Sequence, residues 1–473
     1  MKILSRAIAM ALGTVALVST AQAATFVVQA KTQTFDAQLA RKIEAAGGTI
    51  TARLPQIGVA IVESSDGAFR TRASKVQGVR SVVPDVTLQF ETPETHNAAD
   101  EDFANPPTSG DDDTRFNLQW GAAAIDVAGA WNAGYRGNGV RVAVLDSGIA
   151  CQHVDLGAQV LPDSTSFVPG EGVCLSTIGA FNHGSHVAGI IAAADNAIGT
   201  IGVAPQAKIL AVKVLSESTG SGSFGGIVQG IVYAADHDAD VINMSLGVRG
   251  GLDVGGSDAA ELINATKRAV QYARAKNAIT IVSAGNDGRD LDHDSGVAVC
   301  DADGCYRANL RAFPAQVPGA LAISATTPVG WATNFAGNLD YLASYSNYGQ
   351  SAIAFGAPGG DTPLFGTAPG SANCAVAGIV RPCYVFDLVF APGGYLPGPG
   401  GTLSSFYSWT GGTSMAAPHV SGVAALIIGK HGGELAPSEV ERILRASADD
   451  LGKPGVDDAY GSGRVNAAKA VQF

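Results

Sequence analysis

The sequence predicts an α/β fold, a parallel sheet with helices on both faces, preceded by a small α+β domain. Two observations support this prediction. After residue 140, nearly continuous apolar strands alternate with helical segments, a pattern typical of parallel sheets buried on both faces. Before residue 91 the pattern reads βαββαβ, which is typical of a split βαβ domain. With 473 residues, 46% of them hydrophobic, the chain has ample material for a large core.

Residues 1–23 have the pattern of a secretory signal peptide. Lys2 and Arg6 precede an apolar run over residues 7–18, and Ala21-Gln22-Ala23 matches a cleavage site after Ala23. No other apolar stretch reaches the roughly 20 residues needed to span a bilayer, so we expect no membrane anchor in the mature form. We therefore expect a secreted protein, in the periplasm or in the external medium.

The charge balance excludes some classes of partner. The chain has 30 Lys and Arg against 42 Asp and Glu, a formal net charge of -12, and no basic cluster. This composition argues against nucleic acid and anionic membrane surfaces as partners.

Export makes the 6 cysteines readable as disulfides, although the sequence alone leaves their connectivity open. Pairing between nearest neighbours predicts the bonds Cys151–Cys174, Cys300–Cys305 and Cys374–Cys383. Zinc is the competing interpretation, but the chain has no CxxC pair.

The small domain is expected over residues 24–90. Its predicted strands are 25–28, 49–54, 57–62 and 79–88, and its predicted helices are 35–46 and 68–78. Residues 91–115 contain many acidic residues among prolines and small residues, ending in Asp111-Asp112-Asp113. This composition predicts a solvated linker that is open to proteolysis.

The large domain is expected over residues 116–473. Its predicted strands are 141–146, 208–215, 240–245 and 278–284, and its predicted helices are 186–194, 224–237 and 259–276. Two stretches interrupt the alternation, the Asp-rich residues 287–311 and the Gly- and Pro-rich residues 359–405. Both are predicted loops, long enough to suggest a function.

Ser414 stands at a glycine-flanked turn into an apolar helix, in the segment Gly412-Thr413-Ser414-Met415-Ala416-Ala417-Pro418-His419. We expect Pro418 in the first turn of this helix, where its missing N–H costs nothing. The helix dipole would then favour an oxyanion beside Ser414. The alternative interpretation is that Ser414 caps the helix.

Three further residues occupy the strand ends and helix starts where reactive groups collect in parallel sheets. Asp146 ends an apolar strand, His183 opens a helix, and Asn286 follows a buried strand. A serine nucleophile needs an imidazole base, a carboxylate that orients the imidazole, and a donor to the oxyanion, and these residues supply them. The alternatives are turn residues for Asp146 and Asn286, and a metal pair with His186 for His183.

At this point the chain resembles the subtilisin-like serine proteases, the subtilase family, over roughly residues 115–473. Residues 144–149 (VLDSGI), 183–189 (HGSHVAG) and 412–419 (GTSMAAPH) are similar to the three active-site signatures of that family, in its order Asp, His, Ser. The resemblance implies Ser414 as nucleophile, His183 as base, Asp146 as its orienting carboxylate, and Asn286 with the Ser414 N–H as oxyanion donors.

The implied function is a serine endopeptidase that acts through an acyl-enzyme on protein or peptide substrates, as a monomer. A catalytically silent peptide-binding homologue is the first alternative. A serine esterase is the second, although Ser414 lacks the Gly-x-Ser-x-Gly frame.

The resemblance also implies a substrate cleft in which the peptide lies as an added strand. The implied edge segments are Gly220-Ser221-Gly222 and Ser245-Leu246-Gly247, and the implied lining of the primary pocket is Ser283, Gly285 and Ala312. The alternative for these positions is ordinary Gly and Ser loop chemistry.

A structural calcium ion is implied as well. Its implied ligands are the side chains of Asp155 and Asn196 and the backbone carbonyls of Ala194, Ile198 and Thr200. The N-terminal side-chain ligand of the family has no clear match, and Phe116 falls near its place.

Residues 24–90 resemble the inhibitory propeptide of such proteases, and residues 81–85 fit its last strand. This implies a zymogen whose propeptide assists folding and then acts as an intramolecular inhibitor. The processing site is expected in residues 91–115.

Overall fold

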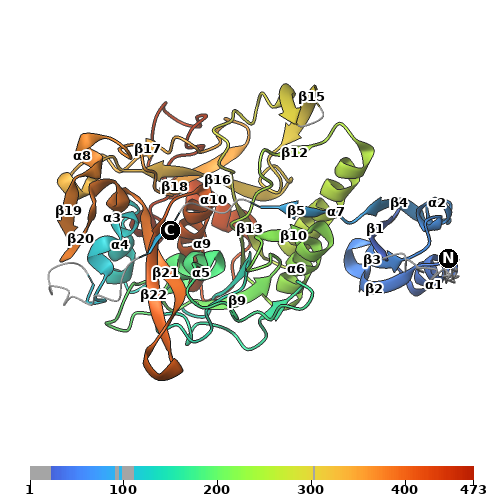
Figure 1. The fold of residues 1–473 in the computed structure, drawn as a ribbon, viewed down its shortest axis with the longest axis horizontal. Helices are drawn as coiled ribbons and strands as arrows, with labels where there is room; N and C mark the ends of the chain where they lie inside the picture. The colour runs from blue at the N-terminus through green and yellow to red at the C-terminus, as the bar shows by residue number, and fades with distance from the viewer. Residues whose placement is uncertain (1–22, 91–94, 98–110, 302–303) are drawn as a thin grey trace, which may run out of the picture.

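A computed structural model describes residues 23–90, 95–97, 111–301 and 304–473 (Figure 1). The expected signal peptide up to residue 22 lies outside the described residues, as do residues 91–94 and 98–110 of the expected linker. A small N-terminal domain lies beside a larger domain, next to the helices labelled α6 and α7 (Figure 1).

The small domain has the predicted element order. Its elements are β1 (Ala24–Ala30), α1 (Ala37–Ala45), β2 (Thr49–Leu54), β3 (Val59–Ser64), α2 (Phe69–Ala73) and β4 (Val79–Pro84). The strands form an antiparallel sheet in the order β2-β3-β1-β4. Phe35, Ile43 and Phe69 join apolar residues of the sheet in a core of the domain's own.

The last predicted strand of this domain, residues 79–88, is wrong in extent. β4 ends at Pro84, and a separate strand β5 (Thr87–Gln89) pairs with β10 (Ser221–Ser223) of the large domain. Proline cannot donate to a strand ladder. The Asp85 N–H still donates to the Thr25 carbonyl of β1 at 2.8 Å, and the Asp85 side chain accepts the backbone N–H of Gly225 at 2.9 Å. The end of the small domain therefore lies on the surface of the large domain.

The large domain is built on the predicted parallel sheet. Its strands are β7 (Arg141–Asp146), β8 (Thr165–Ser166), β9 (Lys208–Lys213), β11 (Val241–Met244), β13 (Ile279–Ser283), β16 (Ala320–Thr327), β17 (Tyr341–Leu342) and β18 (Ile353–Pro358). Their order is β17-β16-β13-β11-β7-β9-β8, with β18 beside β16. The pair β16–β17 is antiparallel, and the other pairs are parallel.

Helices cover both faces of this sheet. Val142 and Val144 of β7 lie in a core with residues of α5 (His183–Ala192) and α9 (Thr413–Lys430). Ala143 and Leu145 lie in a second core with residues of α6 (Phe224–Asp236) and α7 (Ser257–Ala275). Burial on both faces explains why the strands read as continuous apolar runs. The remaining helices are α3 (Trp120–Ala124), α4 (Val127–Asn132), α8 (Ala368–Ser371), α10 (Pro437–Ser447) and α11 (Ala467–Ala470).

The prediction of two long loops is wrong, because both stretches contain strands. Residues 287–311 include the hairpin of β14 (Ser295–Asp301) and β15 (Gly304–Arg311), and β15 pairs with β12 (Leu252–Asp253). The second stretch includes β19 (Asn373–Val376), β20 (Ile379–Pro382), β21 (Val389–Pro397) and the start of β22 (Leu403–Thr410). These strands were not predicted because Gly and Pro are uncommon in strands and interrupt the alternation of apolar and polar residues. The β21–β22 register also shifts between Pro392 and Gly394.

Two of the three predicted disulfides are confirmed, Cys151–Cys174 and Cys374–Cys383. Cys305 is also disulfide-bonded, and the backbone register of β14 and β15 sets Cys300 opposite it. The side chain of Cys300 lies outside the described residues. Within the described part of the chain, no helix combines the length and apolarity needed to cross a membrane.

Candidate active site

Asp146, which is buried, pairs with the partly buried His183 at the end of β7. The Asp146 side chain is 1% exposed, and both of its carboxylate oxygens lie 2.9 Å from His183 Nδ1. Because a carboxylate can only accept, Nδ1 carries the proton and Nε2 is left as the basic nitrogen. Asn182 caps the start of α5 by accepting the Ser185 N–H at 2.7 Å, which fixes the helix turn that carries His183.

The alternative of a metal pair with His186 is not supported. His186 is fully buried, and its Nε2 donates to the Ser408 carbonyl oxygen at 3.1 Å. Burial lowers the pKa of His186 to about 3. His186 therefore contacts β22 as a neutral donor.

Ser414 is the second residue of α9, and the helix-cap interpretation is wrong. The cap position is Gly412, without a side-chain cap bond. Ser414 is 5% exposed, and its Oγ donates to the Ser245 carbonyl oxygen at 3.4 Å. Among the described residues, His183 Nε2 has no hydrogen-bond partner. In substrate-free sites, catalytic hydrogen bonds are often long and tighten only with substrate.

The expectation that Pro418 lies in the first turn of α9 is also wrong, because the helix begins at Thr413 and Pro418 is inside it. A proline at this position removes the helical hydrogen bond to the Ser414 carbonyl, four residues earlier. The Ser245 hydroxyl takes the place of that donor, at 2.7 Å from the Ser414 oxygen. Ser245 therefore supplies the hydrogen bond to the Ser414 carbonyl that Pro418 cannot supply.

Asn286 is held by its side-chain oxygen, which accepts the Thr413 N–H at 2.9 Å and the Thr413 hydroxyl at 2.7 Å. Because its oxygen is bound in this way, the amide nitrogen Nδ2 of Asn286 does not face Thr413. A Cβ added to Gly412 would lie 3.6 Å from both Asn286 Nδ2 and the Ser414 backbone nitrogen. Two N–H donors therefore border one small space beside Gly412, an arrangement that suits an oxyanion.

The predicted edge segments meet around the tail of the small domain. β5 pairs antiparallel with β10, so that Leu88 lies opposite Gly222 and Gln89 opposite Ser221. The next residue, Phe90, donates its N–H to the Gly220 carbonyl at 3.4 Å and forms a bridge with Val248. The tail therefore lies as a strand along the segment 220–222 and contacts Val248, the residue directly after the segment 245–247.

The predicted pocket residues gather behind this strand. Ser283 Oγ donates to the Leu246 carbonyl at 3.4 Å, and a Cβ on Gly247 would lie 3.9 Å from the Gly285 Cα. Ala312 is 9% exposed and precedes Phe313, whose carbonyl accepts the Val248 N–H at 3.0 Å. The structure thus brings all the predicted substrate residues to one region.

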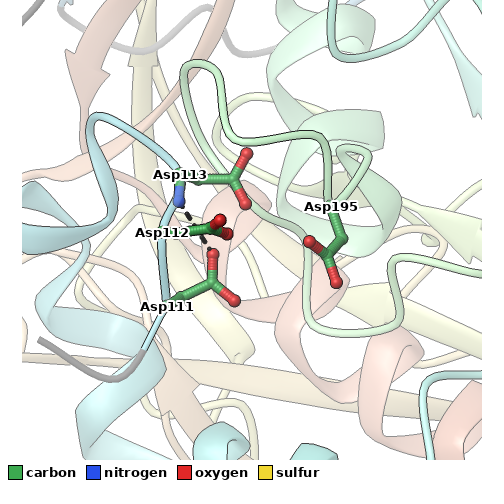
Figure 2. A group of neighbouring side chains, drawn as sticks. All are labelled: Asp111, Asp112, Asp113 and Asp195. Atoms are coloured by element: carbon green, nitrogen blue, oxygen red, sulfur yellow. Dashed lines mark hydrogen bonds between the residues drawn. The ribbon is translucent and has the colours of Figure 1, made fainter. Parts of the chain in front are cut away.

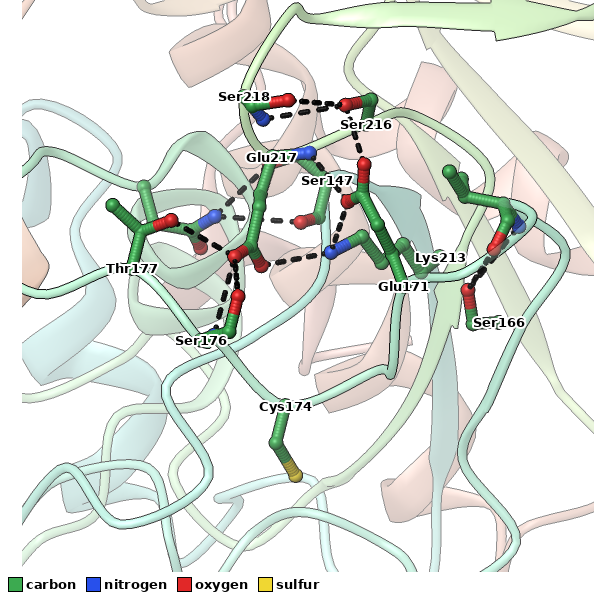
Figure 3. A network of polar contacts seen from close by, with 12 residues as sticks. Ser147, Ser166, Glu171, Cys174, Ser176, Thr177, Lys213, Ser216, Glu217 and Ser218 are labelled. Atoms are coloured by element: carbon green, nitrogen blue, oxygen red, sulfur yellow. Dashed lines mark hydrogen bonds and ion pairs between the residues drawn. The ribbon is translucent and has the colours of Figure 1, made fainter.

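The sequence analysis missed a buried ion cluster beside this site (Figure 3). Lys213 lies opposite Asp146 in the β7–β9 register, and its fully buried Nζ lies 2.8 Å from both Glu171 and Glu217. Glu217 also accepts hydrogen bonds from Ser176 and Thr177. Burial raises the pKa of Glu217. The hydrogen bonds that Glu217 accepts from Lys213, Ser176 and Thr177 have the larger effect and lower its pKa to about 2.

The predicted calcium residues form a compact loop site. Asp155 is fully buried, and its Oδ2 accepts the Thr200 N–H at 3.0 Å, whereas its Oδ1 has no hydrogen-bond partner among the residues that the structure describes. The Ala194 N–H donates to the Asp155 carbonyl at 2.9 Å, and Asn196 Oδ1 accepts the Ile198 N–H at 3.0 Å. Burial raises the pKa of Asp155 to about 7. A buried carboxylate oxygen without a donor fits a site for a hard cation.

Asp113 packs against the same loop, although the sequence analysis assigned it to the solvated linker. Asp113 is fully buried, and its Oδ1 accepts the Ile198 N–H at 3.1 Å. Burial, and then the neighbouring Asp111, raise the pKa of Asp113 to about 8. Phe116, which fell near the missing ligand position, instead packs against Trp131.

The run Asp111-Asp112-Asp113 was the available signal for this site. Its carboxylates converge with that of Asp195 (Figure 2). For Asp113 the prediction of a solvated residue is wrong, because composition cannot tell a solvated acidic run from one whose last residue packs against a distant loop.

Comparisons with known proteins agree with this geometry. A model of the family described as "Subtilase family" matches residues 137–463. The chain is 33% identical over 360 residues to Subtilisin Savinase of Lederbergia lenta, covering 75% of this chain and 99% of the relative. It is 32% identical over 339 residues to Subtilisin DY of Bacillus licheniformis, covering 72% and 93%.

Solved structures show the same fold. The chain is similar to fervidolysin from Fervidobacterium pennivorans, with a TM-score of 0.67 and 24% identity, over 96% of this chain and 62% of the other. It is also similar to the epidermin leader peptide processing serine protease of Staphylococcus aureus, with a TM-score of 0.69 and 20% identity. This match covers 96% of this chain and 98% of the other. The chain therefore belongs to the subtilase family of serine endopeptidases.

Proposed function

We propose that the protein is a secreted serine endopeptidase made as a self-processing zymogen, with Asp146, His183 and Ser414 as its catalytic triad. The observation that carries this proposal is the orientation of His183 by Asp146, at the start of the helix packed against the one that bears Ser414. In the reaction, His183 Nε2 accepts the Ser414 Oγ proton while Oγ attacks the peptide carbonyl. Asn286 Nδ2 and the Ser414 N–H stabilise the oxyanion.

The acyl-enzyme then forms by transfer of the proton from His183 to the leaving amine. Water hydrolyses the ester in the second half of the reaction, with His183 again acting as base. Buried Asp146 keeps the imidazole in one tautomer and stabilises its cation in both halves. The substrates of this reaction would be extended protein or peptide segments.

Residues 24–90 serve as the propeptide in this proposal. Their tail lies against β10 and Val248, with Phe90 only 2% exposed, in the manner of a substrate strand. The next described segment, β6 (Thr95–Asn97), pairs with β22 just before Ser414. The bond cleaved in self-processing would therefore lie between Phe90 and Thr95, a narrower range than residues 91–115.

A structural calcium ion belongs to the same proposal. The carboxylates of Asp113 and Asp155 and the amide oxygen of Asn196 would hold it, with backbone carbonyls of the loop 194–200. The ion would stabilise the buried negative charges and tie the start of the large domain to this loop.

Ser414→Ala tests the catalytic proposal. The wild type should lose residues up to the processing site and hydrolyse casein, whereas Ser414→Ala should remain joined to residues 24–90 and be inactive. Intact mass and N-terminal sequencing of the exported proteins would report both processing and the expected start at Ala24. Casein hydrolysis by Ser414→Ala at the wild-type rate would refute the triad.

Chelation tests the calcium proposal. EGTA should lower the melting temperature of the wild type, and added calcium should restore it. Asp155→Asn should weaken calcium binding in titration calorimetry, with Asp290→Asn as a partly exposed control outside the site. An unchanged calcium affinity in Asp155→Asn would contradict the site.

A further inference from the structure

The turn that follows Asp146 contacts two other parts of the large domain at close range. Gly148 has a φ of +93°, and a Cβ there would lie 2.6 Å from the Val173 carbonyl oxygen and 3.2 Å from Lys213 Cδ. A Cβ added to Gly184, in the first turn of α5, would lie 2.2 Å from the Gly148 carbonyl oxygen. The turn therefore packs against both the start of α5 and the side chain of Lys213, with no room for a larger residue.

The same turn carries the hydrogen bonds that orient Asp146. Its Oδ1 accepts the Ser147 N–H at 2.7 Å and the Ser147 hydroxyl at 3.1 Å. The Ser147 hydroxyl also accepts the Gly184 N–H at 3.2 Å. Because Asp146 Oδ1 lies 2.9 Å from His183 Nδ1 as well, a shift of the turn would change the pairing of the carboxylate with the imidazole.

Lys213 is fixed beside this turn by two carboxylates (Figure 3). Its side chain is fully buried, and its Nζ lies 2.8 Å from both Glu171 and Glu217. Its backbone is fixed as well, because β9 pairs with β7 in register as far as Asp146. Lys213 therefore cannot leave the turn without separating buried charges, which is costly.

The chain from Glu171 to Ser176 joins this ion cluster to the turn. Both of its ends contact the cluster, since Glu171 pairs with the Lys213 ammonium and the Ser176 hydroxyl donates to Glu217. Between these ends, the Val173 carbonyl oxygen accepts the Ile149 N–H at 3.0 Å. Loss of the cluster would thus release this segment from the turn together with the lysine side chain.

We propose that Lys213 is a positioning residue for the pair of Asp146 and His183. The inference rests on the proposed endopeptidase function. With its two carboxylate partners, Lys213 holds residues 147–149 against the start of α5, and this fixes the Asp146 carboxylate at His183 Nδ1. A displacement of about 1 Å in an active site can cost about 10²-fold in rate, so the cluster contributes to kcat through the turn.

The alternative is that the cluster only stabilises the fold. Replacement of Lys213 would then lower the free energy of unfolding and leave the activity of each folded molecule unchanged. The kinetic constants must therefore be expressed per active site, which titration with an irreversible serine-directed inhibitor provides.

Lys213→Met/Glu217→Gln tests the inference. The two replacements remove one charge of each sign, so the net charge of the cluster is kept and the loss of contacts is what is measured. Hydrolysis of a peptide p-nitroanilide substrate should show kcat lowered about 10- to 100-fold. Glu171 keeps the hydrogen bond from the Ser216 hydroxyl at 2.6 Å, so KM should change less than about 3-fold. A kcat equal to that of the wild type would overturn the inference.

Glu217→Gln alone is the milder variant, and it keeps the test valid if the double variant does not fold. It preserves the shape of the side chain and weakens the charged hydrogen bond to Lys213. Its kcat should fall about 2- to 10-fold. An unchanged kcat in this variant would also contradict the positioning role.

Arg464→Met is the matched control for a general loss of stability. Arg464 is only 13% exposed and lies 2.6 Å from both Asp340 and Asp449, so it too is a partly buried cation between two carboxylates. Its replacement should lower the melting temperature and leave kcat per active site at the wild-type value. A fall in kcat as large as that of Lys213→Met/Glu217→Gln would refute the inference.

The Nδ1 proton of His183 provides a spectroscopic signature. In proton NMR, a ring N–H that donates to a carboxylate resonates far downfield of ordinary amide protons. In a Ser414→Ala background, which prevents self-digestion, Lys213→Met/Glu217→Gln should shift or broaden this resonance, and Arg464→Met should not. An identical resonance with and without the cluster would contradict the inference.

The Ser414→Ala protein also separates this inference from the endopeptidase proposal. Hydrolysis of the p-nitroanilide substrate by the wild type, and not by Ser414→Ala, would support the endopeptidase whatever the Lys213 variants show. No hydrolysis by the wild type would refute the endopeptidase, and the inference about Lys213 with it.

Discussion

Asn286 illustrates how a single side chain gains its role from a distant partner. Its position after a buried strand was visible in the sequence, and this predicted a polar group at the sheet edge. Its orientation depends on Thr413, 127 residues later, which binds Oδ1 and so aims Nδ2 at the space beside Gly412. Sequence patterns indicate the local environment of a residue. They do not predict which distant residue will contact it across the sheet.

Asn286→Asp removes this donor while keeping the oxygen that accepts from Thr413. We expect kcat to fall about 10²- to 10³-fold, the scale that subtilisin itself set for one such donor, with little change in KM. Steady-state kinetics on the p-nitroanilide substrate would measure both constants. A matched thermal melt close to that of the wild type would exclude unfolding as the cause, and an unchanged kcat would rule out an oxyanion role for Asn286.

At the scale of elements, α9 shows where the sequence analysis failed. The octet predicted a helix after a glycine turn, and that helix is confirmed. The prediction put Pro418 in the first turn because the start of a helix cannot be fixed from a run of small residues. The true start at Thr413 leaves the Ser414 carbonyl without a helical donor, and Ser245 supplies one from β11 and its following turn.

A double-mutant cycle tests this replacement of a donor. Ser245→Ala should lower the free energy of unfolding by about 1–3 kcal/mol, because the buried Ser414 carbonyl loses its partner. Pro418→Ala restores the helical N–H, so Ser245→Ala should cost less in the Pro418→Ala background. Urea denaturation of the four inactive proteins, all carrying Ser414→Ala to prevent self-digestion, would measure the cycle. Strictly additive costs would contradict the exchange of donors.

The Lys213 cluster acts between elements, since it joins the end of β9 to the chain segments that carry Glu171 and Glu217. Lys213→Met should lower the free energy of unfolding by about 2–3 kcal/mol at pH 7. This is less than the loss expected when a fully buried ion pair is broken, because Glu171 keeps some solvent contact. Glu217 has a lowered pKa, so its contribution is present above its ordinary pKa of 4.5 and is lost as pH falls toward about 2.

The stability difference between the wild type and Lys213→Met should therefore narrow below pH 4.5. Urea unfolding at pH 6 and at pH 3 would show this, with Lys213→Met/Glu217→Gln as the variant in which the difference is already reduced at pH 6. A difference that widens on acidification would contradict the assigned ion pair.

At the scale of the whole molecule, periodicity predicted the domain order and the parallel sheet, because burial on one or two faces leaves a direct mark on each strand. It did not predict how the domains meet. Gln29 is fully buried, although it lies in a strand of the small domain, because its side chain donates to the Glu261 carbonyl of α7 at 2.7 Å. The sequence around a polar residue in a strand does not indicate that a helix of another domain will cover that residue.

Glu261 is the centre of this interface, and it offers a final test of the propeptide as an inhibitor. Its carboxylate accepts from Arg80 at 2.8 Å and from Gln29 at 3.2 Å. Glu261→Ala should weaken inhibition of the mature enzyme by the separate propeptide about 5- to 30-fold, because these charged hydrogen bonds are only partly exposed. Asp258→Ala is the matched control on the same helix, since its pair with Arg70 is 41% and 47% exposed and should matter little.

Inhibition constants for both variants, measured with the p-nitroanilide substrate, would test this difference. Neither change should alter kcat/KM without propeptide, because both residues lie on α7, outside the elements that carry the triad. Equal inhibition constants for Glu261→Ala and the wild type would mean that the tail against β10 supplies the affinity by itself. The docked sheet of the small domain would then serve folding and not inhibition.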